Sequence, residues 1–246
     1  MSKRRHHYSY GIAACGLTIR SSRSRFAASA YVLTFSTTPR RYAGRLNSGV
    51  RRQMSNYAAR LISIFGHPAV LMPAASLIAS SGTRDNSTTV MALLLASTTA
   101  AGIMFYSFVK KRRGDWAHID ASAKSERVEL TRILGPSLLA IAGILQIADL
   151  HPGISIVLGL CGGIVVAAHL LRRLSKPSLH VAFASFATLL VWPNLVASVG
   201  LGPLTALVAW SRLRLERHTG SDVMYGLILG ISAGLIFQVV IRYFDA

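Results

Sequence analysis

Long apolar runs with almost no charge are the feature that most constrains the fold of this chain. Five of them extend over 18 to 20 residues each, at 61–80, 90–109, 133–150, 153–171 and 223–241. A helix needs roughly 20 apolar residues to cross the hydrocarbon core of a bilayer. The sequence therefore predicts a membrane protein in which each of these runs forms a spanning helix.

A sixth apolar region, residues 181–210, is thirty residues long and carries no charge. As one helix it would be about 45 Å long, which is too long for a single span. It also contains Pro193, and a proline removes a backbone donor and disfavours helical geometry in the residue before it. We therefore expect two short spans that reverse near Pro193. The predicted fold class is all-α, a polytopic membrane helical bundle with six or seven transmembrane helices.

The N-terminal region differs in composition from the rest of the chain. The first sixty residues hold 12 of the 27 Lys and Arg residues, and the first acidic residue of the chain is Asp85. Three interpretations are open: a transit-like presequence, a basic tail that binds anionic lipid or nucleic acid, or residues translated from an upstream start. We favour the third, because the segment from Met54 has a polar lead and one arginine before the first span. Residues 1–53 are thus predicted to be a basic extension, and 54–246 the membrane-embedded domain.

Net charge is a poor guide to the partners of this chain. The value of +18 depends largely on the N-terminal region, since residues from Leu61 onward carry fifteen basic and nine acidic side chains. The remaining basic residues gather at the ends of predicted helices, as membrane topology requires. We expect no nucleic-acid partner.

Three polar segments lie at the ends of predicted spans. In the last of them, Ser211 and Arg212 are followed after five residues by His218 and after three more by Asp222. On a helix, His218 and Asp222 share one face, so the carboxylate can fix the imidazole tautomer and leave the other nitrogen free to attack. The alternative is a basic cluster at a membrane surface, with His218 at the interface.

The other two segments carry a second histidine and another arginine. In 172–180, Pro177 and Ser178 would begin a helix well and offer a hydroxyl and N–H groups to an anion, with His180 just behind them. The segment 110–130 is a charged loop that contains Arg127, and the alternative here is a solvated loop without a role in a site.

Together, the three segments resemble the signature of the type 2 phosphatidic acid phosphatase family, membrane lipid phosphatases whose active site is related to that of vanadium haloperoxidases. The Ser211-to-Asp222 pattern matches the third motif in full. The second motif, Pro-Ser-Gly-His, has Leu179 in place of glycine. The first, Lys, six residues, then Arg-Pro, has Asp120 in place of lysine and Val128 in place of proline. Lys124, on the same loop, is the candidate for supplying the missing charge.

The resemblance implies a two-step phosphoryl transfer. His218 would attack phosphorus and form a phosphohistidine, Asp222 would orient it, and His180 would protonate the leaving oxygen and then activate water. Phosphate oxygens would be held by Arg127, Ser178 and Arg212. No metal and no cofactor is implied, because arginines would supply the positive charge.

The resemblance also implies a substrate class, a lipid or isoprenyl phosphate monoester or diphosphate, and a place in the bacterial inner membrane. Two spans separate Arg127 from His180 and two more separate His180 from His218, so all three segments should return to one membrane face. Basic residues dominate the loops on that face, and the positive-inside rule predicts a cytoplasmic site. The main alternative is a non-catalytic relative that binds lipid headgroups or acts as a scaffold, which Asp120 and Leu179 favour.

Overall fold

The structure is a computed structural model that describes residues 53–81, 86–117, 119 and 123–244. These residues belong to one compact unit, Ala43–Ala246. Within them the regular structure is entirely helical, which confirms the predicted all-α class. The predicted N-terminal extension lies outside the described residues except for Gln53, as does Asp120 of the first motif.

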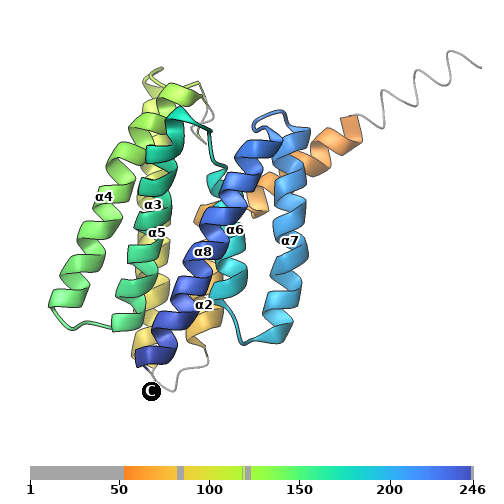
Figure 1. The fold of residues 1–246 in the computed structure, drawn as a ribbon. Coiled ribbons are helices and arrows are strands. Elements are labelled where there is room, and N and C mark those ends of the chain that lie inside the picture. Colours follow the sequence, from red (N-terminus) through yellow and green to blue (C-terminus); the bar gives the residue numbers. More distant parts are fainter. Residues whose placement is uncertain (1–52, 82–85, 118, 120–122, 245–246) are drawn as a thin grey trace, which may run out of the picture. The chain divides into compact units, whose positions relative to one another are not determined.

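From Pro68 onward, consecutive long helices alternate in direction along the bundle (Figure 1). In chain order they are Gln53–Phe65, α2 (Pro68–Ser80), α3 (Asn86–Arg112), α4 (Lys124–Ile147), α5 (Pro152–Leu170), the 3-10 turn η1 (Leu171–Arg173), α6 (Leu179–Leu190), α7 (Leu195–Arg214) and α8 (Gly220–Phe244). Five of them, α3, α4, α5 with η1, α7 and α8, are long and apolar enough to span a membrane. The bent pair Gln53–Phe65 and α2 raises this number to as many as six, so a polytopic helical bundle is the observed architecture.

The reversal predicted near Pro193 is present, but the two helices around it are unequal. Helix α6 has 12 residues and ends at Leu190, whereas α7 has 20 and continues to Arg214. The prediction of two short spans was therefore wrong for α7. The reason is that no helix breaker follows the apolar run, so the helix continues through Ser211 and Arg212, and the structure buries both.

The first predicted span, residues 61–80, is broken. The helix Gln53–Phe65 meets α2 at an angle of 51°. His67 causes the new start: its Nδ1 accepts a hydrogen bond from the N–H of Ala69 at 3.1 Å, and Pro68 occupies the first helical position. A proline there loses no intrahelical bond. Helix α2 is consequently only 13 residues long, close to the length of α6, against which it packs.

Helix α8 packs closely against α6 through a stripe of glycines. A Cβ on Gly226 would lie 2.6 Å from the carbonyl oxygen of Ser178, and one on Gly234 would lie 2.5 Å from Cβ of Leu189. A Cβ on Gly230 would collide with the carbonyl oxygen of Ala182 and with Oγ of Ser185. Small residues at such positions let helix backbones approach each other inside a membrane. The stripe holds the start of α8 beside the start of α6.

Gly230→Ala should therefore destabilise the protein. Its methyl group would press on backbone that cannot rotate away, and overpacking of this kind costs about 1–3 kcal/mol. We expect a lower melting temperature in detergent for this variant. Gly202→Ala, in α7, is the control because no neighbouring atom lies within 4 Å of the added carbon. Equal melting temperatures for the two variants would contradict the close packing of α6 on α8.

Candidate active site

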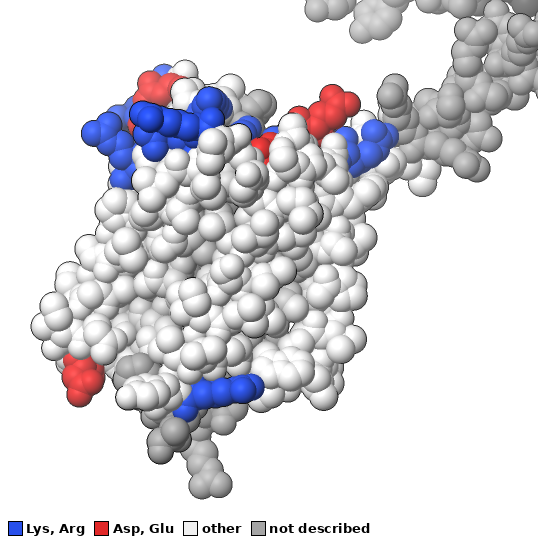
Figure 2. Space-filling view, viewed as in Figure 1, with Lys and Arg blue, Asp and Glu red and all other residues white. Residues whose placement is uncertain are grey.

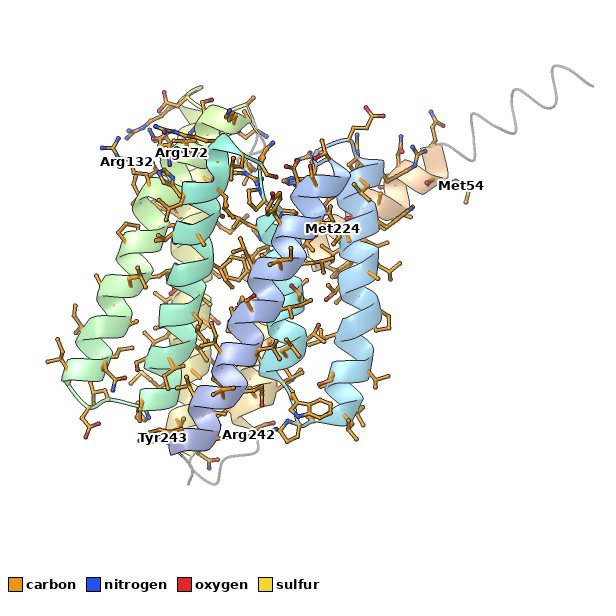
Figure 3. The ribbon with its side chains drawn as sticks, in the orientation of Figure 1. Met54, Arg132, Arg172, Met224, Arg242 and Tyr243 are labelled. Carbon is orange, nitrogen blue, oxygen red and sulfur yellow. The ribbon has the colours of Figure 1, made fainter. Side chains whose placement is uncertain are left out.

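The three polar segments meet at one end of the bundle. This end is formed by the start of α4, the start of α6 and the connection from α7 to α8 (Figure 1). Figure 3 shows Arg132 and Arg172 at this end and Arg242 and Tyr243 at the opposite end. In Figure 2, Lys and Arg side chains gather at the same end, while the middle of the visible face is free of charge. The sequence expectation that the segments share one membrane face agrees with this arrangement.

Asp222 ties the start of α8 to the segment before α6. Its Oδ1 accepts hydrogen bonds from Oγ of Ser175 and from the N–H of Lys176, both at 2.8 Å. Its Oδ2 accepts from the N–H of Thr219 at 2.9 Å, and its backbone carbonyl accepts from the N–H of Ser178 at 2.9 Å. The acidic side chain in the first helical turn also suits the positive end of the helix dipole. Asp222 therefore fixes the path of the loop that precedes His180.

His218 is buried between this loop and α4. Its Nδ1 lies 3.2 Å from the carbonyl oxygen of Lys176 and 3.6 Å from Oδ2 of Asp222. Its Nε2 lies 3.3 Å from Nη2 of Arg127. A guanidinium can only donate, so Nε2 must be the acceptor and, in the neutral ring, the proton is on Nδ1. The tautomer needed for attack through Nε2 is thus the one that these contacts favour.

The expected direct contact between Asp222 and His218 is weaker than the spacing suggested. At 3.6 Å the carboxylate lies beyond a normal hydrogen bond, and the carbonyl of Lys176 is the nearer acceptor. Asp222 instead acts on His218 mostly through the loop, because it holds the N–H of the same Lys176 residue. The local i, i+4 spacing predicted proximity, and the tertiary contact with the loop decides the hydrogen bond.

Arg127 reaches the site from the first turn of α4. Its Nη1 donates to the carbonyl oxygen of Pro177 at 2.7 Å, in addition to the contact with His218. Helix α4 begins at Lys124, nine residues before the predicted apolar run, because Glu126 caps it by accepting from the N–H of Ala123 at 3.1 Å. This earlier start turns a predicted loop arginine into a helical one that points into the bundle.

Ser178, His180 and Arg212 complete the cluster. All three are buried, with Arg212 only 1% exposed. Arg127, Arg212 and His218 all lie within electrostatic reach of His180. Nη1 of Arg212 donates to Oγ of Ser63 at 2.8 Å, which links α7 to the first helix. The hydroxyl of Ser178 is buried and makes no hydrogen bond to any described residue, although buried hydroxyls nearly always do.

Sequence reasoning missed three residues near this cluster. The ring of His67 packs edge-on against His180, with the ring centroids 4.8 Å apart. Ser63 accepts the bond from Arg212, and Lys176 supplies the backbone groups that hold His218 and Asp222. His67 precedes a proline, and a His-Pro pair in an apolar run is typical of a helix kink or a helix start. Only the tertiary fold brings it to His180.

The departures from the family pattern have different consequences. Lys124, the expected replacement for the missing lysine, is exposed at the start of α4 and so is not part of the buried cluster. Leu179, in place of glycine, is the first residue of α6 and is buried. The start of a helix leaves N–H groups without intrahelical partners and carries a partial positive charge. The backbone of α6 can therefore still face an anion, although the leucine side chain takes up space.

The electrostatics of the site favour a neutral His218. Burial, followed by the positive charges of Arg127, Arg212 and Lys176, holds the pKa of His218 well below its ordinary value, although Asp222 raises it. A neutral imidazole keeps a lone pair on Nε2 at neutral pH. The same low pKa makes the folded state resist protonation.

Acidification should therefore destabilise the protein. In the unfolded chain His218 has an ordinary pKa and binds a proton as the pH falls below about 6.5, whereas the folded state binds it only at lower pH. The unfolded state then binds more protons, and the free energy of unfolding falls as the pH falls through this window. We expect the melting temperature to drop between pH 7.5 and 5.5, and to drop less in His218→Asn. An unchanged pH dependence in that variant would show that His218 is not the group responsible.

Within the described ranges, no three His, Cys, Asp or Glu side chains are grouped so that they could hold a metal ion. The positive charge around the cluster comes from Arg127, Arg212 and Lys176.

Comparison of the chain with protein-family models, with curated proteins and with solved structures finds no match.

Proposed function

We propose that this chain is an integral membrane phosphatase, similar to type 2 phosphatidic acid phosphatases, that hydrolyses a lipid or isoprenyl phosphate. One observation carries the proposal: two buried arginines, Arg127 and Arg212, lie within electrostatic reach of both His180 and His218, and Arg127 contacts His218 and the carbonyl of Pro177, the residue before Ser178. Guanidinium groups suit phosphate because they offer parallel N–H donors and positive charge to its oxygens, and the carboxylate of Asp222 is directed at three other N–H and O–H donors. The oxygens of a phosphate group would accept hydrogen bonds from such guanidinium groups and from a serine hydroxyl.

The reaction would proceed in two steps. Nε2 of His218 attacks phosphorus, the bond from phosphorus to the lipid oxygen breaks, and His180 gives its proton to that oxygen. His180 then takes a proton from water, the hydroxide oxygen attacks the phosphohistidine, and inorganic phosphate leaves with Nε2 restored. Arg127 would move from Nε2 to the phosphate oxygens, where bidentate contacts stabilise the five-coordinate transition state.

A non-catalytic, headgroup-binding relative is the second candidate. Leu179 favours it, because its side chain narrows the place where the family has a glycine. The orientation of His218 favours catalysis: its Nε2 is the acceptor nitrogen and lies next to the arginine that would hold phosphate. A pure binding site would not need that tautomer.

Phosphate release from a panel of lipid and isoprenyl phosphates tests the proposal. The full chain in detergent with EDTA should release phosphate from at least one substrate, because arginines replace the metal in charge stabilisation. The panel should include phosphatidic acid, lysophosphatidic acid, phosphatidylglycerol phosphate and isoprenyl mono- and diphosphates. No release from any of them by folded protein would favour the non-catalytic candidate.

The membrane face of the site is a further part of the proposal. The basic side chains at the site end include Lys110, Lys111, Arg112, Arg113, Arg172, Arg173, Lys176, Arg214 and Arg217. Among described residues, the opposite end holds Arg242 (Figure 3) and Asp149, which lies in the connection from α4 to α5. This asymmetry supports a cytoplasmic site in a bacterial inner membrane.

A reporter fused after Ala246 checks this topology, because α8 starts at the site end and finishes at the other (Figure 1). A cytoplasmic site predicts that the reporter is active outside the cytoplasm. A reporter that is active in the cytoplasm would place the site on the outer face.

A further inference from the structure

An apolar cavity of about 620 Å³ extends from the candidate site into the bundle. Its lining begins with His67, Arg127 and His180 and reaches Trp192, Gln238 and Arg242 at the opposite end. Along α6 it passes from His180 to Leu190, a distance of about 15 Å at the helical rise per residue. The residues between these ends are mainly apolar and come from α2, α3, α4, α5, α6 and α8.

This cavity is too large to be a packing defect. Protein interiors are close-packed, and their voids are rarely larger than a water molecule. Ligand pockets, in contrast, measure about 300–1,000 Å³. An apolar cavity of this size that stayed empty would leave its lining without contacts on one side. An apolar occupant would restore these contacts, so we expect the cavity to bind one.

The ends of the cavity differ in chemistry, and this difference defines the occupant. The site end has the guanidinium of Arg127 and the ring of His180. The far end has Gln238, whose amide already donates to the carbonyl oxygens of Leu189 and Trp192 at 2.8 and 3.3 Å. Arg242 also lines the far end, but its side chain is exposed, whereas Arg127 is buried. The buried cation that can hold an anionic group therefore lies at the site end, and the remainder suits an unbranched or regularly branched hydrocarbon.

We infer that the cavity binds one linear apolar chain of the substrate, with the phosphate at Arg127 and His180 and the chain end toward Trp192. The assignment of the anionic group as a phosphate rests on the proposed function. The binding site for the apolar chain, called the chain site below, is argued from the cavity alone. The volume is that of one medium-sized ligand, so the site selects single-chain phosphates, such as isoprenyl or lysolipid phosphates, over two-chain glycerolipids.

Small side chains on α3 form one wall of the chain site. Ala92, Ala96 and Ala100 recur every four residues along this helix and all line the cavity. Helix α3 runs toward the site end, so Ala92 lies one turn farther from His180 than Ala96 does. Of its 27 residues only Ala92 and Ser107 are buried. It is thus the wall that can move with the least loss of packing when a chain enters from the bilayer.

Phenylalanine substitutions at two depths along α3 test the inference, because each should block bound chains that are longer than a certain length. The full chain in phosphatidylcholine nanodiscs is titrated with n-alkyl phosphonates from butyl to hexadecyl, whose carbon–phosphorus bond the proposed reaction does not cleave. In Ala96→Phe we expect roughly tenfold or greater loss of affinity for hexadecyl phosphonate, a loss of the size that steric exclusion gives in apolar pockets. Affinity for butyl phosphonate should stay unchanged, which also shows that the variant is folded. In Ala92→Phe, the loss should begin at longer chains than in Ala96→Phe.

Ala101→Phe is the matched control, because Ala101 is exposed on the same helix and does not line the cavity. Equal effects of Ala96→Phe and Ala101→Phe at every chain length would overturn the inference, as would the same cut-off in Ala92→Phe and Ala96→Phe. These results would leave the proposed function standing if the unaltered chain releases phosphate. Chain-length-dependent binding without phosphate release from any substrate would support the chain site and contradict the phosphatase.

Discussion

Replacing His218 by asparagine is expected to abolish phosphate release. Asparagine keeps a polar group that can reach the carbonyl of Lys176, the partner of Nδ1 at 3.2 Å, but it has no nitrogen that can attack phosphorus. Loss of a catalytic nucleophile leaves only the contribution of binding and charge stabilisation, so kcat should fall by at least about 10⁴-fold. The measurement is phosphate release under saturating substrate, with the melting temperature recorded to confirm folding.

His151→Asn is the matched control for this variant. His151 precedes α5 at the opposite end of the bundle, where its Nδ1 lies 3.1 Å from Oγ1 of Thr88. Its replacement should leave kcat unchanged. Activity of His218→Asn at the level of His151→Asn would remove His218 from the mechanism.

Replacing Arg127 should have the second-largest effect. The Arg127 side chain contacts both His218, the proposed nucleophile, and the loop before His180. Removing one group that stabilises transition-state charge typically costs about 10²–10³-fold in kcat, and we expect a loss of this size for Arg127→Ala. Arg127→Lys should recover only part of the activity, because an ammonium group cannot reproduce the planar two-pronged contact.

Arg132→Ala tests whether the effect of Arg127→Ala comes from the position of Arg127 in the site or only from the loss of one positive charge. Arg132 lies on the same helix, five residues further on, but it is exposed. Its removal should change kcat less than about threefold, as expected for a screened surface charge. Comparable losses in the two alanine variants would mean that the site responds to overall charge and that Arg127 has no specific role.

Much of the bundle could be predicted from the sequence, because a helix that spans a bilayer needs an apolar run of roughly 20 residues. The reversal at Pro193 followed from the excess length of residues 181–210. Gly226, Gly230 and Gly234 recur every four residues, a pattern typical of close helix packing. The bend before α2 could not be predicted as clearly. Its cause is the cap that His67 forms, and a His-Pro pair is compatible with both a kink and a helix start.

The candidate site was less predictable than the fold. Spacing placed His218 near Asp222, but whether Nδ1 pairs with the carboxylate or with a carbonyl depends on the loop through Lys176, which is distant in sequence. The charge of Lys124 could be noted from the sequence, whereas its exposure could not. Long-range contacts such as Arg212 with Ser63 carry no local signal at all.

Trapping of a phosphoenzyme tests the central claim most directly. The His180→Ala variant should still accept phosphate from a substrate with a good leaving group, such as an aryl phosphate, because the first step then needs no acid, but it should hydrolyse the intermediate slowly without a base. Rapid quenching at alkaline pH followed by mass spectrometry of peptides should find one phosphate on His218, and none in the His180→Ala/His218→Asn double variant. Phosphate on another residue, or none at any time point while product forms, would contradict the account.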